Sequence, residues 1–252
     1  MPELLQLPYS PWSERARWAL DLTGVAYTTR TYQPLIGELG LRRLLHKWRG
    51  PVGAPVLRDG PSVIAGGLDI ARHAAARSGD ARLFPPGEEA RVLHYAALSD
   101  RGLSAGRALA MRRVLASPAA QIELVPRPLQ RSPRAARALG ALGTHYVLRK
   151  YEGDREAPAA YERTLTETLD ALRFGLAEST SRADPRTLLA ELSYADIAMA
   201  QVLVFVQPPS VGLRMGPACR AAFELPALAD RYADLVGWRD ALYAHCRGPR
   251  AR

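Results

Sequence analysis

The pattern of hydrophobic and polar positions predicts a strand, a helix and a second strand at the start of the chain. An apolar run at residues 3–7, ELLQL, is suited to a buried strand, and helix signals follow at once. Ser10 is a candidate N-cap, Pro11 suits the first turn, and Gly24 stands where a left-handed residue ends a helix. Residues 25–32 then alternate and are rich in β-branched and aromatic residues. This pattern predicts a βαβ unit.

Two further strands and a helix complete the first domain. Short apolar segments at 54–58 and 61–65 are joined by an Asp-Gly dipeptide, which is typical of a tight hairpin turn. A helix is expected from about 68 to 76. The sequence therefore predicts an α/β domain with the order βαβ-ββα.

The remainder of the chain carries only helical patterns. Residues 77–88 are rich in turn formers and have no apolar period, so they predict a connection between two domains. We place the first domain at 1–80, the linker at 81–87 and an all-α helical domain at 88–252.

One helix of the second domain is marked by an apolar stripe with spacings of three and four residues. Its members are Tyr161, Leu165, Leu169, Leu172 and Leu176. Three prolines at 125–134 must interrupt the helices, and an apolar run at 197–206 predicts a buried helix. The pattern as a whole predicts a helical bundle.

The composition favours a soluble protein with a strongly basic surface. The chain has 252 residues, is 48% hydrophobic and carries a net charge of +9. Nearly all positive residues are arginines spread among acids, which favours a solvated surface. A local concentration at 107–137 leaves two interpretations open, an anion-binding groove and a solvated helix face. The net charge is also compatible with a basic module that binds nucleic acid or another protein, and no other feature of the sequence supports that function. We expect no nucleic-acid partner.

Targeting, membrane and metal signals are all weak. The first residues lack the pattern of a secretory signal, so we expect a cytoplasmic protein. No apolar run approaches the roughly 18 residues that a membrane-spanning helix needs, so the sequence predicts no such helix and we expect no membrane partner. Cys219 and Cys246 are the only cysteines, and the histidines are scattered. We therefore expect neither a disulfide nor a metal.

Four local sequences, in this order, resemble motifs of the glutathione-transferase superfamily. They are Ser10-Pro11-Trp12-Ser13, Ala54-Pro55-Val56-Leu57, the segment ELSYADIAMA that contains Ser193 and Asp196, and the ending from Phe223 to Arg247. Ser193 and Asp196 also have the spacing of a helix capping box, which is a structural role. The matches extend over nearly the whole chain.

This resemblance implies a thioredoxin-like first domain that binds glutathione and a helical second domain that binds a hydrophobic electrophile. It implies a cis peptide bond at Pro55 and a backbone contact from Ala54 to the cysteinyl part of glutathione. It also implies a homodimer and a function in detoxification. Glutathione would be a co-substrate for conjugation, displacement or isomerisation.

The chemistry of glutathione transfer requires a thiolate, and a free thiol with a pKa of about 8.5 is mostly protonated at neutral pH. A hydroxyl at the positive end of a helix is able to stabilise the anion, and Ser10 has this position. Ser13 is the second catalytic candidate, and the phenol of Tyr9 is the third. An ordinary N-cap role for Ser10 is the alternative. Without a cysteine in this turn, thiol–disulfide exchange is disfavoured.

The resemblance places Tyr9, Trp12, Ala54, Pro55, Gly66 and Gly67 at the glutathione-binding site. The last two depart from the family pattern, in which an acidic residue and a serine hold the γ-glutamyl end. Arg72, Lys47 and Trp48 are candidate replacement contacts. A tight turn is the alternative role for the two glycines. They also favour the competing hypothesis of a glutathione-independent protein of the same fold, either a ligand carrier or a specialised biosynthetic enzyme.

Overall fold

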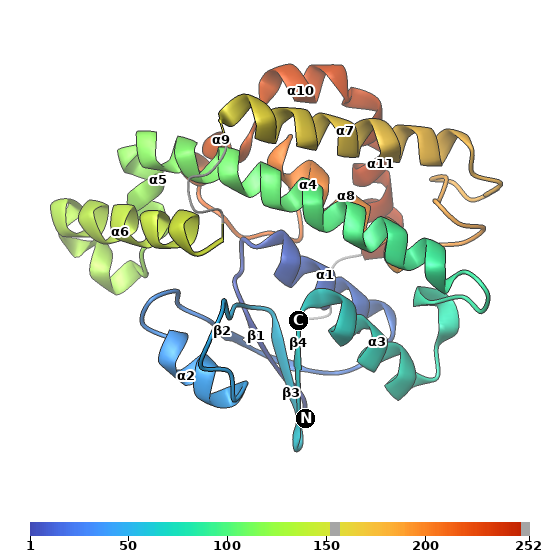
Figure 1. The fold of residues 1–252 in the computed structure, drawn as a ribbon, viewed down its shortest axis with the longest axis horizontal. Coiled ribbons are helices and arrows are strands. Elements are labelled where there is room, and N and C mark those ends of the chain that lie inside the picture. The colour runs from blue at the N-terminus through green and yellow to red at the C-terminus, as the bar shows by residue number, and fades with distance from the viewer. Residues whose placement is uncertain (152–156, 248–252) are drawn as a thin grey trace.

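The first part of the chain folds into a four-stranded mixed sheet (Figure 1). The computed structural model describes residues 1–151 and 157–247. The strands are β1 (Glu3–Gln6), β2 (Thr28–Thr31), β3 (Val56–Asp59) and β4 (Ser62–Ala65), in the spatial order β2-β1-β3-β4. β1 pairs in parallel with β2 and antiparallel with β3, and β3 forms an antiparallel hairpin with β4.

Side-chain alternation in the strands gives this sheet two covered faces. The helices of this part are α1 (Pro11–Leu22), α2 (Glu38–Leu44) and α3 (Gly67–Ser78). Leu4 and Leu57 pack with residues of α1 and α3, whereas the neighbouring Leu5 and Val56 pack with Leu41 of α2. β2 is an edge strand with exposed side chains. The predicted βαβ-ββα fold is confirmed, with α2 as an additional helix that the sequence pattern did not predict.

The predicted turns have the backbone conformations that their glycines allow. Gly24 follows α1 with φ of +68°, and Gly60 lies in the β3–β4 hairpin with φ of +57°. Both values are in the left-handed region, which glycine adopts without a steric penalty. The helix stop and the hairpin predicted at these positions are therefore confirmed.

Most of the rest of the described chain is helical. It contains η1 (Ala81–Leu83), α4 (Glu89–Ala116), α5 (Pro118–Glu123), η2 (Arg127–Arg131), α6 (Pro133–Tyr151), α7 (Pro158–Ala177), α8 (Tyr194–Ala200), η3 (Val202–Phe205), α9 (Pro217–Phe223), α10 (Pro226–Arg231), α11 (Ala233–Leu242) and the π-helical turn η4 (Tyr243–Arg247). The proline-rich segment forms η2 and separates α5 from α6, as its prolines predicted.

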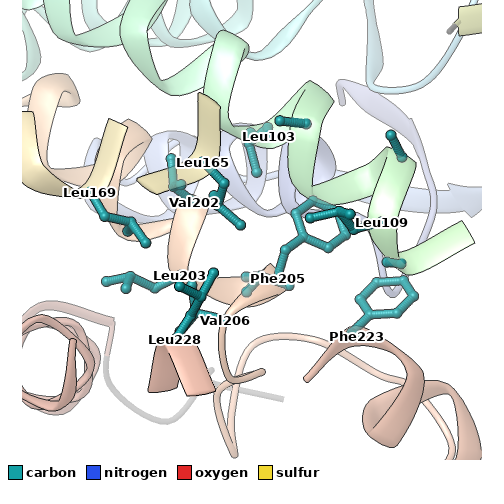
Figure 2. Packing of buried hydrophobic residues seen from close by; sticks show 14 of the residues in the cluster. Leu103, Leu109, Leu165, Leu169, Val202, Leu203, Phe205, Val206, Phe223 and Leu228 are labelled. Atoms are coloured by element: carbon teal, nitrogen blue, oxygen red, sulfur yellow. The ribbon is translucent and has the colours of Figure 1, made fainter. Parts of the chain in front are cut away.

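The main core lies between α4, α7 and the segment from α8 through η3 (Figure 2). Leu165, Leu169 and Leu172 of the predicted stripe are fully buried there. The buried helix predicted over 197–206 is divided, because α8 ends at Ala200 and η3 follows. In η3 the N–H of Val204 donates to the carbonyl of Gln201, three residues back, which is the tighter 3₁₀ pattern.

The predicted capping box begins α8 in the centre of the helical part. Ser193 Oγ accepts a hydrogen bond from the N–H of Ala195 at 3.2 Å, and the Asp196 carboxylate accepts from the N–H of Ser193 at 2.9 Å. Asp196 also accepts from the N–H of Leu188 at 2.7 Å. Burial raises the pKa of Asp196 to about 6, so the group is ionised at neutral pH and acts as an acceptor.

We expect Asp196→Ala to lower the free energy of unfolding by about 2 kcal/mol, because two buried N–H groups lose their acceptor. Urea denaturation of the variant and of the wild type measures this difference. Glu162→Ala, on the exposed side of α7, is the control and should change stability by less than about 0.5 kcal/mol. Equal stability of the two variants would contradict the structural role of the box.

Some features are not observed in the described part of the chain. In residues 1–151 and 157–247, no helix is long and apolar enough to cross a bilayer. The same residues contain no group of three or more potential metal ligands. Cys219 is buried, Cys246 is half-buried, and both are free thiols.

Candidate functional site

A cavity of about 380 Å³ lies between the sheet and the helical part. Its walls come from the β1–α1 turn, the loops after β2 and before β3, and helices α4, α6 and α9. Most of the lining is apolar, including Met111, Phe205 and Phe223. Volume and lining are those of a site for a small, largely apolar molecule.

Ser10 lies at the wall of this cavity, at the N-terminus of α1. It is 7% exposed and has the extended backbone conformation of an N-cap, with Pro11 in the first turn. Its Oγ accepts from the N–H of Ser13 at 3.4 Å, which is long for a hydrogen bond. The oxygen of the Ser10 hydroxyl therefore accepts only a weak capping hydrogen bond, and its hydrogen is available for donation to a ligand.

Ser13 is close to Ser10 in the sequence but has a different environment. It is fully buried, its Oγ accepts from the N–H of Leu7 at 3.1 Å, and it is not among the residues that line the cavity. This bond fixes the turn between β1 and α1. The position suits a residue that shapes the turn, and a catalytic role for Ser13 remains a prediction.

Tyr9 and Trp12 both line the cavity. Burial raises the pKa of Tyr9 above its usual value, so its phenol stays protonated at neutral pH. Trp12 is half-buried, and its ring is tilted by 58° against Phe205 with 6.4 Å between the ring centroids. Tyr9 precedes Ser10 in the sequence and Trp12 follows it, and both contribute aromatic surface to the cavity wall.

The peptide bond between Ala54 and Pro55 is cis. Ala54 lines the cavity, whereas Pro55 is buried outside the lining and its carbonyl accepts from the N–H of Gly66 at 3.0 Å. The cis bond implied by the family resemblance is therefore present. Ala54 and Ser10 line the same cavity.

Gly66 and Gly67 lie where α3 begins, and neither lines the cavity. Gly66 has φ of +92°, a backbone conformation that side-chain-bearing residues rarely adopt. A Cβ at Gly67 would lie 3.1 Å from Tyr194 Oη and 3.2 Å from Arg15 Cβ. Backbone conformation and close packing thus account for the two glycines.

The candidate replacement contacts lie away from the cavity lining. Arg72 forms an ion pair with Glu89 at 2.8 Å, and Lys47 and Trp48 are exposed in the segment after α2. A carboxylate does occur near the two glycines, since Asp69 is in the first turn of α3. Asp69 lies after the two positions at which the family pattern has its acidic residue and serine, so the sequence pattern did not identify it.

Helices α4 and α6 contribute to the cavity wall, which the sequence pattern did not predict. Tyr151 lies over Arg107 with 4.3 Å between the guanidinium carbon and the ring centroid, and its hydroxyl donates to the carbonyl of Val52 at 3.3 Å. The Lys150 ammonium contacts Glu38 at 2.7 Å. These contacts connect the helical part to the α2–β3 region. In the sequence, the concentration of arginines that begins at Arg107 was the one feature that pointed to this part of the cavity.

A buried charge network lies beneath the turn that carries Ser10. The fully buried carboxylate of Glu14 contacts Arg17 at 2.5 Å and Arg247 at 2.8 Å. Arg17 donates to the carbonyls of Leu7 and Pro8, each at 3.4 Å. Burial works to lower the pKa of Arg247, but the nearby carboxylates outweigh it and raise the pKa above its usual value. The network connects η4 to the β1–α1 turn.

Comparison with known proteins agrees with this geometry. Residues 4–82 match the family model described as "Glutathione S-transferase, N-terminal domain". No curated protein matches the sequence significantly. Residues 4–82 are therefore similar to the N-terminal domain of glutathione S-transferases, and the rest of the chain lies outside this match.

Solved structures share the fold over almost the full length. A glutathione S-transferase from Methylobacterium radiotolerans, in complex with glutathione sulfonate, is 18% identical with a TM-score of 0.61, over 97% of this chain and 91% of that one. The maleylacetoacetate isomerase of Anaeromyxobacter dehalogenans, with glutathione in its active site, is 17% identical with a TM-score of 0.54, over 100% and 98%. At these identities the similarity establishes the fold.

Proposed function

We propose that this protein is a glutathione transferase in which Ser10 stabilises the glutathione thiolate. The observation that carries the proposal is the weakly held Ser10 hydroxyl, which lies at the start of α1 and lines the same cavity as Ala54. The family match over residues 4–82 and glutathione-bound neighbours such as the Anaeromyxobacter isomerase support glutathione as the co-substrate. Ala54 would contact its cysteinyl part through the backbone.

In the proposed reaction, the thiolate sulfur attacks an electrophilic carbon of a substrate held by the apolar walls. A carbon–sulfur bond forms, and either a leaving group departs with its electron pair or the product of addition is protonated. The Ser10 hydroxyl donates to the sulfur before the attack, and the partial positive charge of the α1 N-terminus favours the anion. Each unit by which the thiol pKa falls requires about 1.4 kcal/mol of preferential stabilisation.

Gly66 and Gly67 favour a second candidate function, a glutathione-independent ligand carrier or biosynthetic enzyme. With no side chain at either position, two contacts to the γ-glutamyl group are missing, and about 2 kcal/mol of lost interaction weakens binding roughly thirtyfold. Asp69 and the backbone N–H groups at the start of α3 are the groups available to replace them.

Calorimetric titration with glutathione distinguishes the two candidates. The transferase hypothesis predicts saturable binding at submillimolar concentration and turnover of a generic aryl halide. Binding that is absent or weaker than millimolar, in protein shown to be folded by circular dichroism, would exclude it and leave the glutathione-independent alternative.

The family resemblance further supports a homodimer, with the helical part of one subunit against the first domain of the other. Sedimentation equilibrium should give twice the 27.5 kDa chain mass, and a monomer mass would contradict this part of the proposal.

A further inference from the structure

A strongly basic surface lies on η2 and α6, at one end of the molecule (Figure 1). The segment 124–151 contains six Arg and Lys residues and no Asp or Glu. Five of the six are exposed arginines, which together form what we call the basic surface: Arg127, Arg131, Arg134, Arg137 and Arg149.

The arginines of the basic surface lack the carboxylate partners that exposed arginines have elsewhere in the chain. Arg82 and Arg173, for example, contact aspartates at 2.6 and 2.5 Å. Within residues 1–151 and 157–247, none of the five arginines forms an ion pair. Lys150, the remaining cation of the segment, contacts Glu38 at 2.7 Å. The five charges are therefore available to an anionic partner.

Exposed leucines lie among these arginines. Leu129 of η2 is 45% exposed, and Leu142 of α6 is 58% exposed. Arg134, Leu142 and Arg149 are eight and seven residues apart, so they share one face of α6. Arginine and leucine together on an exposed helix face are typical of a segment that lies on an anionic bilayer, where leucine enters the interface and arginine contacts the lipid headgroups.

Another face of α6 lines the cavity between the sheet and the helical part. Leu139, Gly143 and Val147 are four residues apart on this face, and most of the cavity lining is apolar. A protein held on a bilayer through the basic surface would therefore keep this cavity close to the lipid, in which apolar molecules concentrate.

We propose that the basic surface binds an anionic lipid bilayer, with its arginines at the headgroups and Leu129 and Leu142 in the interface. This goes beyond the function proposed above and does not depend on glutathione. A second copy of the chain is a poorer partner, because a net charge of +9 offers no complementary charge. Nucleic acid, which is contacted mainly by polar groups, gives the exposed leucines no role. The expectation of no membrane partner concerned a spanning helix, and contact at the surface requires none.

Sedimentation with lipid vesicles tests the proposal. At about 50 mM NaCl, we expect vesicles with roughly equal amounts of phosphatidylcholine and phosphatidylglycerol to bind the protein at least about tenfold more tightly than vesicles of phosphatidylcholine alone. About 500 mM NaCl should weaken the binding to the anionic vesicles about tenfold or more, because salt screens the charges. Equal binding to the two kinds of vesicle, or binding to neither, would overturn the proposal.

Paired substitutions assign the binding to the basic surface. Each arginine near an anionic bilayer strengthens binding about fivefold, so Arg134→Gln together with Arg137→Gln should weaken it about 25-fold. The matched control is Arg182→Gln with Arg186→Gln, which removes the same charge from the loop after α7, at the other end of the molecule (Figure 1). Equal binding of the two double variants would mean that net charge alone attracts the protein, and would contradict the assignment.

Leu129→Ser with Leu142→Ser tests the apolar contact without a change in charge. This pair should weaken binding to the anionic vesicles about fivefold or more, because the leucines no longer enter the interface. Unchanged binding in the folded variant would contradict the bilayer assignment. So would binding of a DNA duplex of about 20 base pairs as tight as that of the anionic vesicles, which would assign the surface to nucleic acid. Circular dichroism checks that each variant is folded.

Discussion

Ser10→Ala is expected to lower kcat/KM for conjugation of an aryl halide at neutral pH by about 10- to 100-fold. The lost bond between a hydroxyl and a charged acceptor is worth about 1.5–3 kcal/mol, so the pKa of the bound thiol should rise by about 1–2 units. The deficit should shrink as the pH rises through the thiol pKa, because the thiolate then forms without the bond. A pH–rate profile of both proteins measures this shift.

Two further substitutions separate the hydroxyl from the cap. Ser10→Gly also removes the hydroxyl, but glycine is an acceptable N-cap and costs only a few tenths of a kcal/mol of stability. It should lose as much activity as Ser10→Ala, and Ser10→Thr should restore most of it. Full activity in a folded Ser10→Gly protein would show that Ser10 is only an ordinary cap.

Glu14→Gln is expected to lower the free energy of unfolding by about 3–5 kcal/mol. Glu14 is fully buried between Arg17 and Arg247, and both guanidinium groups would lose a charged partner in the protein interior. Because Arg17 also holds the carbonyls of Leu7 and Pro8, the loss should extend to the turn that carries Ser10. Urea denaturation measures the stability, and the conjugation assay measures the effect on the site.

Glu89→Gln provides the control for an exposed ion pair. Glu89 contacts Arg72 at 2.8 Å, and its side chain is 63% exposed, so its replacement should cost less than about 1 kcal/mol. A loss in Glu14→Gln no larger than in Glu89→Gln would mean that the buried network adds little to stability.

The local features of the first domain were predictable because they depend on neighbouring residues. The Ser10 cap, the left-handed Gly24 and the β3–β4 hairpin each follow from a few residues of sequence. α2 was missed because it is short and buries only Leu41, so it has no clear apolar stripe. The division of the predicted helix over 197–206 was also unforeseen, because an apolar run of this length does not reveal a change from α to 3₁₀ geometry.

The parts of the site that depend on long-range contacts were not predictable. Glu14 and Arg17 are three residues apart, a spacing typical of a solvated helix face. Their burial depends on contacts from distant parts of the sequence, such as those of Arg247 to Glu14 and of Gly212 to Arg17. In the same way, Arg107 gains its position from Trp12 and Tyr151, which come from distant parts of the sequence. Ser10 and Ala54, to which the family resemblance assigned roles, both line the cavity, whereas the resemblance gave no information on Arg107.

A crystal structure of the protein with glutathione tests the central claim most directly. We predict that the sulfur lies within about 3.5 Å of Ser10 Oγ, a hydrogen-bonding distance for sulfur, and that the cysteinyl backbone pairs with Ala54. The γ-glutamyl group should reach the start of α3 near Asp69. A glutathione sulfur directed away from Ser10, or a cavity that stays without glutathione at saturating concentration, would contradict the assignment of this site to a serine-type glutathione transferase.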